Sequence, residues 1–129
     1  AGANHALGGL STFPFPAFDP ARMGDYHPDT RDMVIGNDVW IGFGAVLCPG
    51  ATIGNGVIVG AGAVVRGAVP DYAVVTGNPA QVIRMRFAPQ TVARMNALAW
   101  WDWPDDLVAR AQREIMGAQV GALARMASQ

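Results

Sequence analysis

The sequence predicts an all-β solenoid with a helical C-terminal cap, in which the chain winds as a parallel β-helix of hexapeptide repeats. Three observations predict this fold: a six-residue period of aliphatic side chains, small residues beside many of them, and a change to a helical period from about residue 89. A single repeat cannot bury its own apolar face, whereas stacked repeats can. We expect the β-helix at residues 1–87, with an excursion loop at 11–32, and the helical cap at residues 88–129.

The period of six occurs in two registers. It matches neither the 3.6-residue period of a helix nor the two-residue period of a flat strand. It fits a triangular coil in which each hexad supplies one short strand and one corner, with the first series pointing inward and the second at the corners. Glycines are expected to permit positive φ at those corners. The inward series is Ile35, Ile41, Leu47, Ile53, Val59 and Val65, the corner series is Val39, Ala45, Ala51, Val57, Ala63 and Val69, and the corner glycines are Gly42, Gly50, Gly54, Gly56 and Gly62.

The composition excludes several classes of protein. Hydrophobic residues make up 51% of the chain and charged residues 15%, which favours a packed core. A formal net charge of -1 argues against a nucleic-acid or anionic-membrane partner, and no apolar run approaches the roughly 18 residues of a membrane span. One cysteine excludes an internal disulfide, and together with two histidines it makes a structural zinc cluster improbable. We therefore expect a cytoplasmic protein without a metal; the missing initiator methionine suggests a fragment of a longer chain.

The flanking segments differ from the repeats. Prolines and aromatic residues at 11–32 predict an ordered loop that packs on a neighbour. Near the C-terminus, Val92, Met95 and Leu98 share one helical face. Asp102 is the expected N-cap of a second helix, which carries Pro104 and two aspartates in its first turn. A last short helix is expected to hold Val120, Leu123 and Met126.

Four segments carry a resemblance to a known family: GANHALGGLSTFPF at the start, VIGNDVWIG at 34–42, PDYAVVTGNPAQVIRMRF at 70–87 and ALAWWDWP at 97–104. They resemble the hexapeptide-repeat xenobiotic acetyltransferases, the group of the type B chloramphenicol and the streptogramin acetyltransferases. The resemblance implies a left-handed parallel β-helix, acetyl-CoA as co-substrate, an acceptor hydroxyl on a small molecule and assembly as a homotrimer. It also implies a further N-terminal segment ahead of this sequence.

The resemblance makes His5 the candidate general base and Asn4 a substrate-binding residue. A hydroxyl that attacks a thioester must lose its proton, and imidazole accepts protons near neutral pH without a metal. Direct transfer in a ternary complex, with no acetyl-enzyme, is implied. Without the motif, a histidine near a terminus is more often an ordinary surface residue; His27 lacks such a context and is interpreted as structural.

Coenzyme contacts are expected from Trp40, beside the pantetheine arm, and from the corner glycines Gly42 and Gly60. The turn at Asn78 and Pro79 resembles the one that lies against the nucleotide end. Each of these residues also has a structural alternative. For Trp40 it is burial under the loop or under a partner chain, and for the two glycines it is a role in turning the chain alone. For the turn at Asn78 and Pro79 it is a rigid exit from the last coil.

The phosphate contacts depart from the family pattern, because Gly67 and Gln81 stand where relatives often carry lysine. Arg66 and Arg84 are the nearest replacements, and guanidinium groups bind phosphate in a bidentate manner.

Other candidates are interpreted as structural. Cys48 lacks a neighbouring base and is expected to serve packing, and the tryptophans of WWDW are expected to anchor the cap. Three competing functions remain: O-acetylation of a sugar or another small metabolite such as serine, a γ-type carbonic anhydrase, and a non-catalytic solenoid. The zinc enzyme needs three histidines for each metal and the chain has two, so it is disfavoured.

Overall fold

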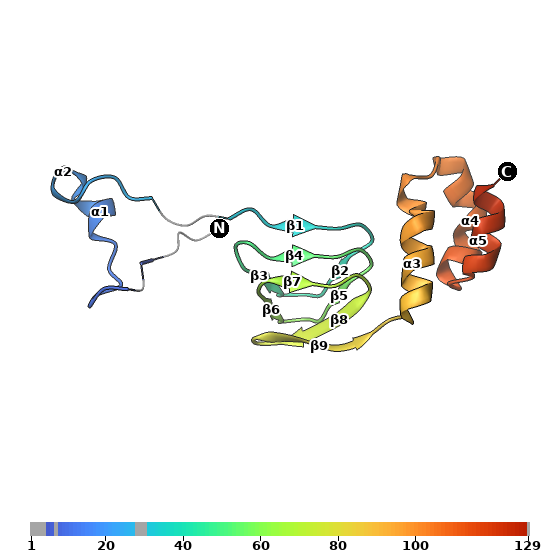
Figure 1. Ribbon diagram of the computed structural model, residues 1–129, viewed down its shortest axis with the longest axis horizontal. Helices are drawn as coiled ribbons and strands as arrows, with labels where there is room; N and C mark the ends of the chain where they lie inside the picture. Colours follow the sequence, from blue (N-terminus) through green and yellow to red (C-terminus); the bar gives the residue numbers. More distant parts are fainter. Residues whose placement is uncertain (1–4, 7, 28–30, 129) are drawn as a thin grey trace.

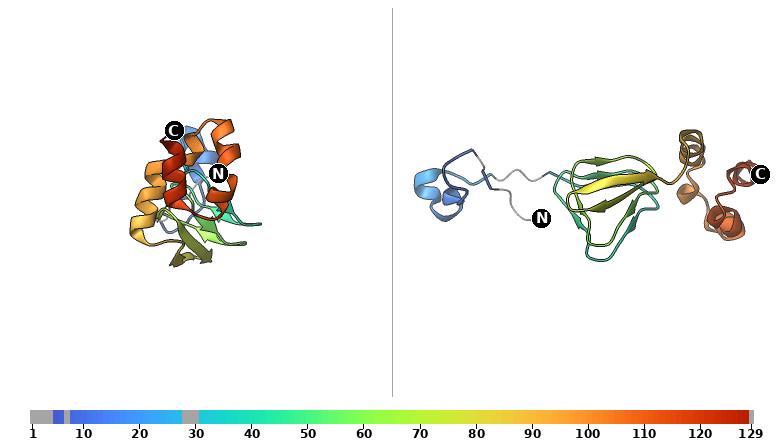
Figure 2. Two further views of the ribbon diagram at one scale, coloured as in Figure 1. Left: turned by 90° about the vertical axis from the view of Figure 1, so that its right-hand side faces the viewer. Right: turned by 90° about the horizontal axis from the view of Figure 1, so that it is seen from below.

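The computed structural model describes residues 5–6, 8–27 and 31–128. Short parallel strands stack in three sheets, one for each side of a triangular coil (Figures 1 and 2). The sheets have the orders β1-β4-β7, β2-β5-β8-β9 and β3-β6. The strands are β1 (Val34–Ile35), β2 (Trp40–Ile41), β3 (Val46–Leu47), β4 (Thr52–Ile53), β5 (Ile58–Val59), β6 (Val64–Val65), β7 (Ala68–Val69), β8 (Ala73–Gly77) and β9 (Ala80–Met85).

The strand register confirms the period of six. Val34 pairs with Thr52, eighteen residues later, so three hexads make one turn of the coil. Thr52 then pairs with Ala68, sixteen residues later, so the next turn is two residues shorter. β9 turns back and pairs antiparallel with β8, which ends the parallel winding. The expectation of a parallel β-helix is therefore confirmed.

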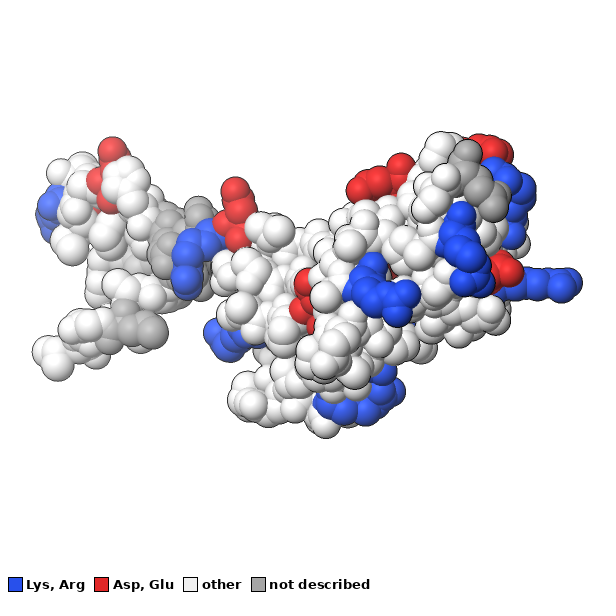
Figure 3. Space-filling model, turned by 45° about the vertical axis from the view of Figure 1, so that its right-hand side comes forward, with Lys and Arg blue, Asp and Glu red and all other residues white. Residues whose placement is uncertain are grey.

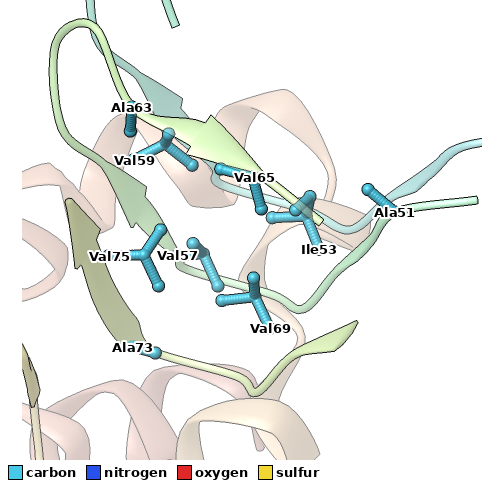
Figure 4. Close-up of a cluster of buried hydrophobic side chains, with 9 residues drawn as sticks. All are labelled: Ala51, Ile53, Val57, Val59, Ala63, Val65, Val69, Ala73 and Val75. Atoms are coloured by element: carbon cyan, nitrogen blue, oxygen red, sulfur yellow. The ribbon is translucent and has the colours of Figure 1, made fainter. Parts of the chain in front are cut away.

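The core is formed by the two aliphatic series of the second and third turns (Figure 4). These side chains point into the coil and contact their counterparts in the next layer, which removes their apolar surface from water. The first turn differs: Ile35 is 47% exposed and Ile41 is 39% exposed, because no layer formed by the described residues covers them. The buried cluster is Ala51, Ile53, Val57, Val59, Ala63, Val65, Val69, Ala73 and Val75.

Polar side chains join the layers at the corner between the first and second sheets. The Asn55 carboxamide oxygen accepts a hydrogen bond from the Asn37 backbone N–H at 2.8 Å, and Asp71 Oδ1 accepts one from the Asn55 N–H at 2.8 Å. Asp71 Oδ2 accepts another from Asn96 Nδ2, at 2.6 Å. One ladder of side chains thus fixes the stacking of three turns and attaches a helix to the coil.

Tyr72 lies at the same corner and is fully buried. Its ring faces Gly56 of the layer above, and Arg86 crosses over the ring at 5.6 Å while donating a hydrogen bond to the Gly56 carbonyl at 2.6 Å. Burial, with a smaller contribution from Asp38, raises the pKa of the Tyr72 hydroxyl, and the guanidinium opposes this shift. The hydroxyl therefore remains protonated at neutral pH.

The expectation for the corner glycines was partly wrong. Gly50, Gly56 and Gly62 do have positive φ, but Gly42 and Gly54 do not. A methyl group at Gly42 would lie 2.5 Å from the backbone nitrogen of Ala61, and one at Gly54 would overlap Asp71. These two positions require glycine because the next layer lies too close for a side chain.

The C-terminal region is helical, as expected: α3 (Pro89–Leu98), a 3₁₀ turn η1 (Trp100–Asp102), α4 (Asp105–Met116) and α5 (Val120–Ala127). The expected N-cap at Asp102 was wrong, because Pro104 precedes the first residue of α4 and no side chain caps it. The helices also do not close the end of the coil. They lie beside the Asp71 corner, while β9 runs along the end (Figure 1). The ladder through Asn96 fixes this side-on position.

The segment expected as a loop contains two single-turn helices, α1 (Phe15–Phe18) and α2 (Pro20–Met23). Both lie away from the strands in Figure 1 and in the right view of Figure 2. Phe13 packs against Phe15 and Phe18, with ring centroids 4.8 and 5.1 Å apart, so the loop has a small apolar cluster of its own. Within the described residues, no helix is long and apolar enough to cross a membrane.

Candidate active site

His5 lies on the N-terminal side of the projecting loop and is exposed. Its Nδ1 is 2.6 Å from the carbonyl oxygen of Thr12. A carbonyl only accepts hydrogen bonds, so Nδ1 carries the proton in this contact and donates it. The neutral ring then has its lone pair on Nε2, which is the form that a general base requires. Asn4, the expected substrate contact, lies outside the described residues.

The loop that carries His5 is held by local contacts. The Ser11 hydroxyl accepts a hydrogen bond from the Phe13 backbone N–H at 3.1 Å, and the phenylalanine cluster follows directly. Its outer ring, Phe18, is 72% exposed. The loop is thus locally ordered and presents apolar surface away from its own coil.

The expected coenzyme residues of the coil follow one corner, between the second and third sheets. Trp40 points outward from β2 and is 68% exposed. Gly42 and Gly60 follow in successive layers, and a methyl group at Gly60 would lie 2.7 Å from the Thr76 side chain. Stacking therefore already requires glycine at both positions, so their presence alone does not indicate a ligand. The exposed tryptophan is the residue that stacking leaves unexplained.

The turn at Asn78 and Pro79 joins β8 to β9 at the same corner, two layers away from Trp40, and both residues are exposed. The two candidate phosphate ligands are exposed as well, but they lie apart. Arg66 follows β6, at the corner between the third and first sheets, whereas Arg84 lies on β9 opposite Val74. The structure thus brings Trp40 and the turn to one corner, and places the two arginines on different sides of the coil.

Sequence reasoning overlooked Arg86, which lines a hollow between the coil and the helices. Asp38, Phe87 and Trp100 also line it. The guanidinium stacks over the Phe87 ring at 5.3 Å and binds the Gly56 carbonyl. Nothing in the sequence distinguishes this arginine from Arg84 two residues earlier, because its role depends on layers that are distant in sequence.

The remaining candidates have structural surroundings. Cys48 is half-buried. Trp103 Nε1 donates a hydrogen bond to the Leu98 carbonyl at 2.9 Å, and the rings of Trp100 and Trp101 meet edge to face at 6.3 Å, so the tryptophans contact the helical region itself. His27 is exposed. In the part of the chain that the structure describes, no group of three His, Cys, Asp or Glu residues is placed to hold a metal.

On the face shown in Figure 3, basic and acidic side chains are interspersed over both the coil and the helical region. An extended basic surface of the kind that binds nucleic acid is not seen on this face.

Comparisons with known proteins identify several proteins that are similar to this chain. The bacterial transferase hexapeptide family (six repeats) matches residues 32–67. The chain is 43% identical to a chloramphenicol acetyltransferase of Agrobacterium fabrum, over 90% of this chain and 57% of that protein. It is 38% identical to a probable macrolide acetyltransferase of Lysinibacillus sphaericus, over 79% of this chain and 59% of that protein. The chain thus spans less than two thirds of the length of these curated relatives.

A solved structure extends the comparison to the fold. A hexapeptide-repeat-containing acetyltransferase of Vibrio cholerae O1 biovar eltor, crystallised with acetyl coenzyme A, is 32% identical, with a TM-score of 0.51 over 67% of this chain and 41% of that chain. The stacked hexads and these similarities show a hexapeptide-repeat coil like that of these acetyltransferases. The chain is therefore similar, over most of its length, to hexapeptide-repeat acetyltransferases that include chloramphenicol and macrolide acetyltransferases.

Proposed function

We propose that the whole protein is an acetyl-CoA-dependent O-acetyltransferase that modifies a hydroxyl group of a small xenobiotic, with a chloramphenicol- or streptogramin-like antibiotic as acceptor. The observation that carries the proposal is the His5 ring, which donates from Nδ1 to the Thr12 carbonyl and keeps Nε2 free to accept a proton. Similarity to acetyltransferases over most of the chain supports the reaction class. We also propose that the coil is left-handed and that the chain has two regions, the β-helix at residues 1–87 and the helical region at residues 88–129. The proposed compartment of the protein is the cytoplasm.

The proposed reaction is direct acetyl transfer. Nε2 of His5 removes the acceptor proton while the acceptor oxygen attacks the thioester carbonyl carbon. The new C–O bond forms, the C–S bond breaks, and the leaving sulfur takes the proton from the His5 imidazolium and departs as the free thiol. Asn4 is proposed to bind the acceptor beside His5. No step requires a metal or an acetyl-enzyme.

We propose that the active site lies between copies in a homotrimer. The loop with His5 projects away from its own coil, and Trp40 faces outward from β2, so a neighbouring copy brings the two together (Figure 1). The flat sides of a triangular coil suit packing around a threefold axis. Equilibrium sedimentation at micromolar concentration should give the mass of a trimer. A monomer under these conditions would contradict the shared site.

The coenzyme is proposed to lie along the corner from Trp40 past Gly42 and Gly60 to Asn78 and Pro79, with Arg66 and Arg84 as phosphate contacts. Replacing either arginine by Ala should raise KM for acetyl-CoA about tenfold or more and leave KM for the acceptor nearly unchanged, since a charged hydrogen bond contributes roughly 1.5 to 3 kcal/mol. Steady-state kinetics with each substrate varied in turn measures both constants. If neither variant changes KM for acetyl-CoA, other donors bind the phosphates.

The experiment that tests the function follows thiol release from acetyl-CoA with chloramphenicol, a group A streptogramin, a galactoside and serine as acceptors. Turnover of either antibiotic, with little turnover of the sugar or serine, is the expected result. Preference for the sugar or serine would indicate another hexapeptide acetyltransferase activity. Absence of coenzyme A binding would indicate a non-catalytic solenoid.

A further inference from the structure

Phe43 follows β2, and its side chain is 95% exposed. A single exposed apolar residue is ordinary on a protein surface. The position of Phe43 in the layers of the coil distinguishes it from other exposed apolar residues.

Phe43 lies at the corner between β2 and β3. Its carbonyl accepts a hydrogen bond from the Gly62 N–H at 2.9 Å, so the phenylalanine lies directly over the equivalent corner of the next layer. In the two layers beyond, the positions equivalent to Phe43 are occupied by Ala61 and Gly77. A methyl group at Gly44 or Gly62 would meet no atom within 4 Å. The positions below Phe43 are therefore occupied by small residues, and there is open space at Gly44 and Gly62 of this corner.

This column of small residues connects the two ends of the proposed coenzyme site. Trp40 lies on β2 in the first layer, and the turn at Asn78 and Pro79 follows β8 in the third. Paired strands lie about 4.8 Å apart, so the turn is about 10 Å along the coil from Trp40. A linear molecule that passes from the exposed tryptophan to the turn must run down this corner, and Phe43 stands where it enters.

We infer that the Phe43 ring packs against the pantetheine arm of the coenzyme. This inference rests on the proposed acetyl-CoA site. The arm is a chain of methylene groups and two amides, and its methylene groups gain from an apolar ring that shields them from water. The column of small residues lets the arm approach the backbone on the other side. The phosphates and the base lie beyond the arm, so Phe43 should contribute equally to the binding of acetyl-CoA and of acetyl-pantetheine.

The test compares Phe43→Ala with wild type in the full-length protein, by calorimetric titration with acetyl-CoA and acetyl-pantetheine. We expect Kd to rise about tenfold for both ligands, as for the loss of one mostly buried aromatic side chain. KM for the acceptor and the sedimenting mass should remain unchanged. Phe43→Trp should restore binding, because it keeps an apolar ring at the corner. Met116→Ala is the matched control, since Met116 is 89% exposed on α4, away from this corner.

Three results would overturn the inference: unchanged Kd values for Phe43→Ala, a rise confined to KM for the acceptor, or loss of the oligomer with binding retained at high protein concentration. The second would place the ring at the acceptor, and the third in a subunit interface. Failure of the wild-type protein to bind acetyl-CoA would instead reject the proposed function, and the inference with it.

Discussion

Replacing His5 by Ala in the full-length protein should lower kcat by on the order of 10²- to 10⁴-fold, which is the usual contribution of a positioned general base. Nδ1 of the wild-type ring is bound to the Thr12 carbonyl, so Nε2 is the nitrogen that accepts the proton. The binding of acetyl-CoA should be nearly unaffected, since the imidazole faces the reacting oxygen. The loss therefore belongs to the chemical step. Thiol release at saturating acetyl-CoA and a binding titration separate the two effects.

The pH profile gives a second measurement of the same prediction. An imidazolium cannot accept a proton, so wild-type kcat/KM should fall at low pH. The matched control is His27→Ala, because His27 is exposed and is the other histidine of the chain. That variant should keep both the rate and the profile. Wild-type turnover by His5→Ala would show that another group, or solvent, removes the proton.

Gly56→Ala should destabilise the fold by about 2 to 5 kcal/mol. The added methyl group would overlap the ring of Tyr72, which is fully buried and cannot move aside. Overpacking a core costs about 1 to 3 kcal/mol, and a left-handed backbone adds about 1 to 2 kcal/mol for a residue with a side chain. Urea denaturation followed by circular dichroism gives the free energy of unfolding.

Gly62→Ala is the control that separates crowding from backbone conformation. Gly62 has φ of 68° and Gly56 has φ of 63°, but a methyl group at Gly62 would meet no atom within 4 Å. The Gly62→Ala substitution should therefore cost only the free energy of the left-handed backbone conformation, about 1 to 2 kcal/mol. In a double-mutant cycle, Gly56→Ala should destabilise the Tyr72→Ala protein by about as little as Gly62→Ala destabilises the wild type. Equal destabilisation by both glycine substitutions would show that the Tyr72 ring is not the reason why position 56 requires glycine.

Gly56 shows which features of a corner the repeat pattern predicts and which it does not. Asp38 and Tyr72 occupy the equivalent corners of the neighbouring turns, with φ of 54° and 57°, although neither is glycine. The left-handed conformation is thus tolerated there by residues with side chains. The repeat pattern predicted the turn, but only the stacked layers show that the tyrosine ring below makes glycine necessary.

The sequence by itself determined the parallel coil, the inward and corner series and the three C-terminal helices. These features follow from periods of six and 3.6 residues, which are local properties of the chain. It also identified His5 and Trp40 through motifs, and their roles remain proposals. The side of the coil on which the helices lie was decided by Asn96 and Asp71, which are 25 residues apart and meet only after folding.

The tertiary structure also decided the state of the proposed base and the arrangement around it. The proton on Nδ1 follows from the Thr12 carbonyl, a backbone group that no motif identifies. The exposure of Ile35 and Ile41 follows from their place in the outermost turn, although they obey the same pattern as the buried Ile53. A residue type and its spacing predict which way a side chain points. What lies against that side chain depends on the neighbouring layers, because burial and hydrogen bonding are properties of contacts between segments distant in sequence.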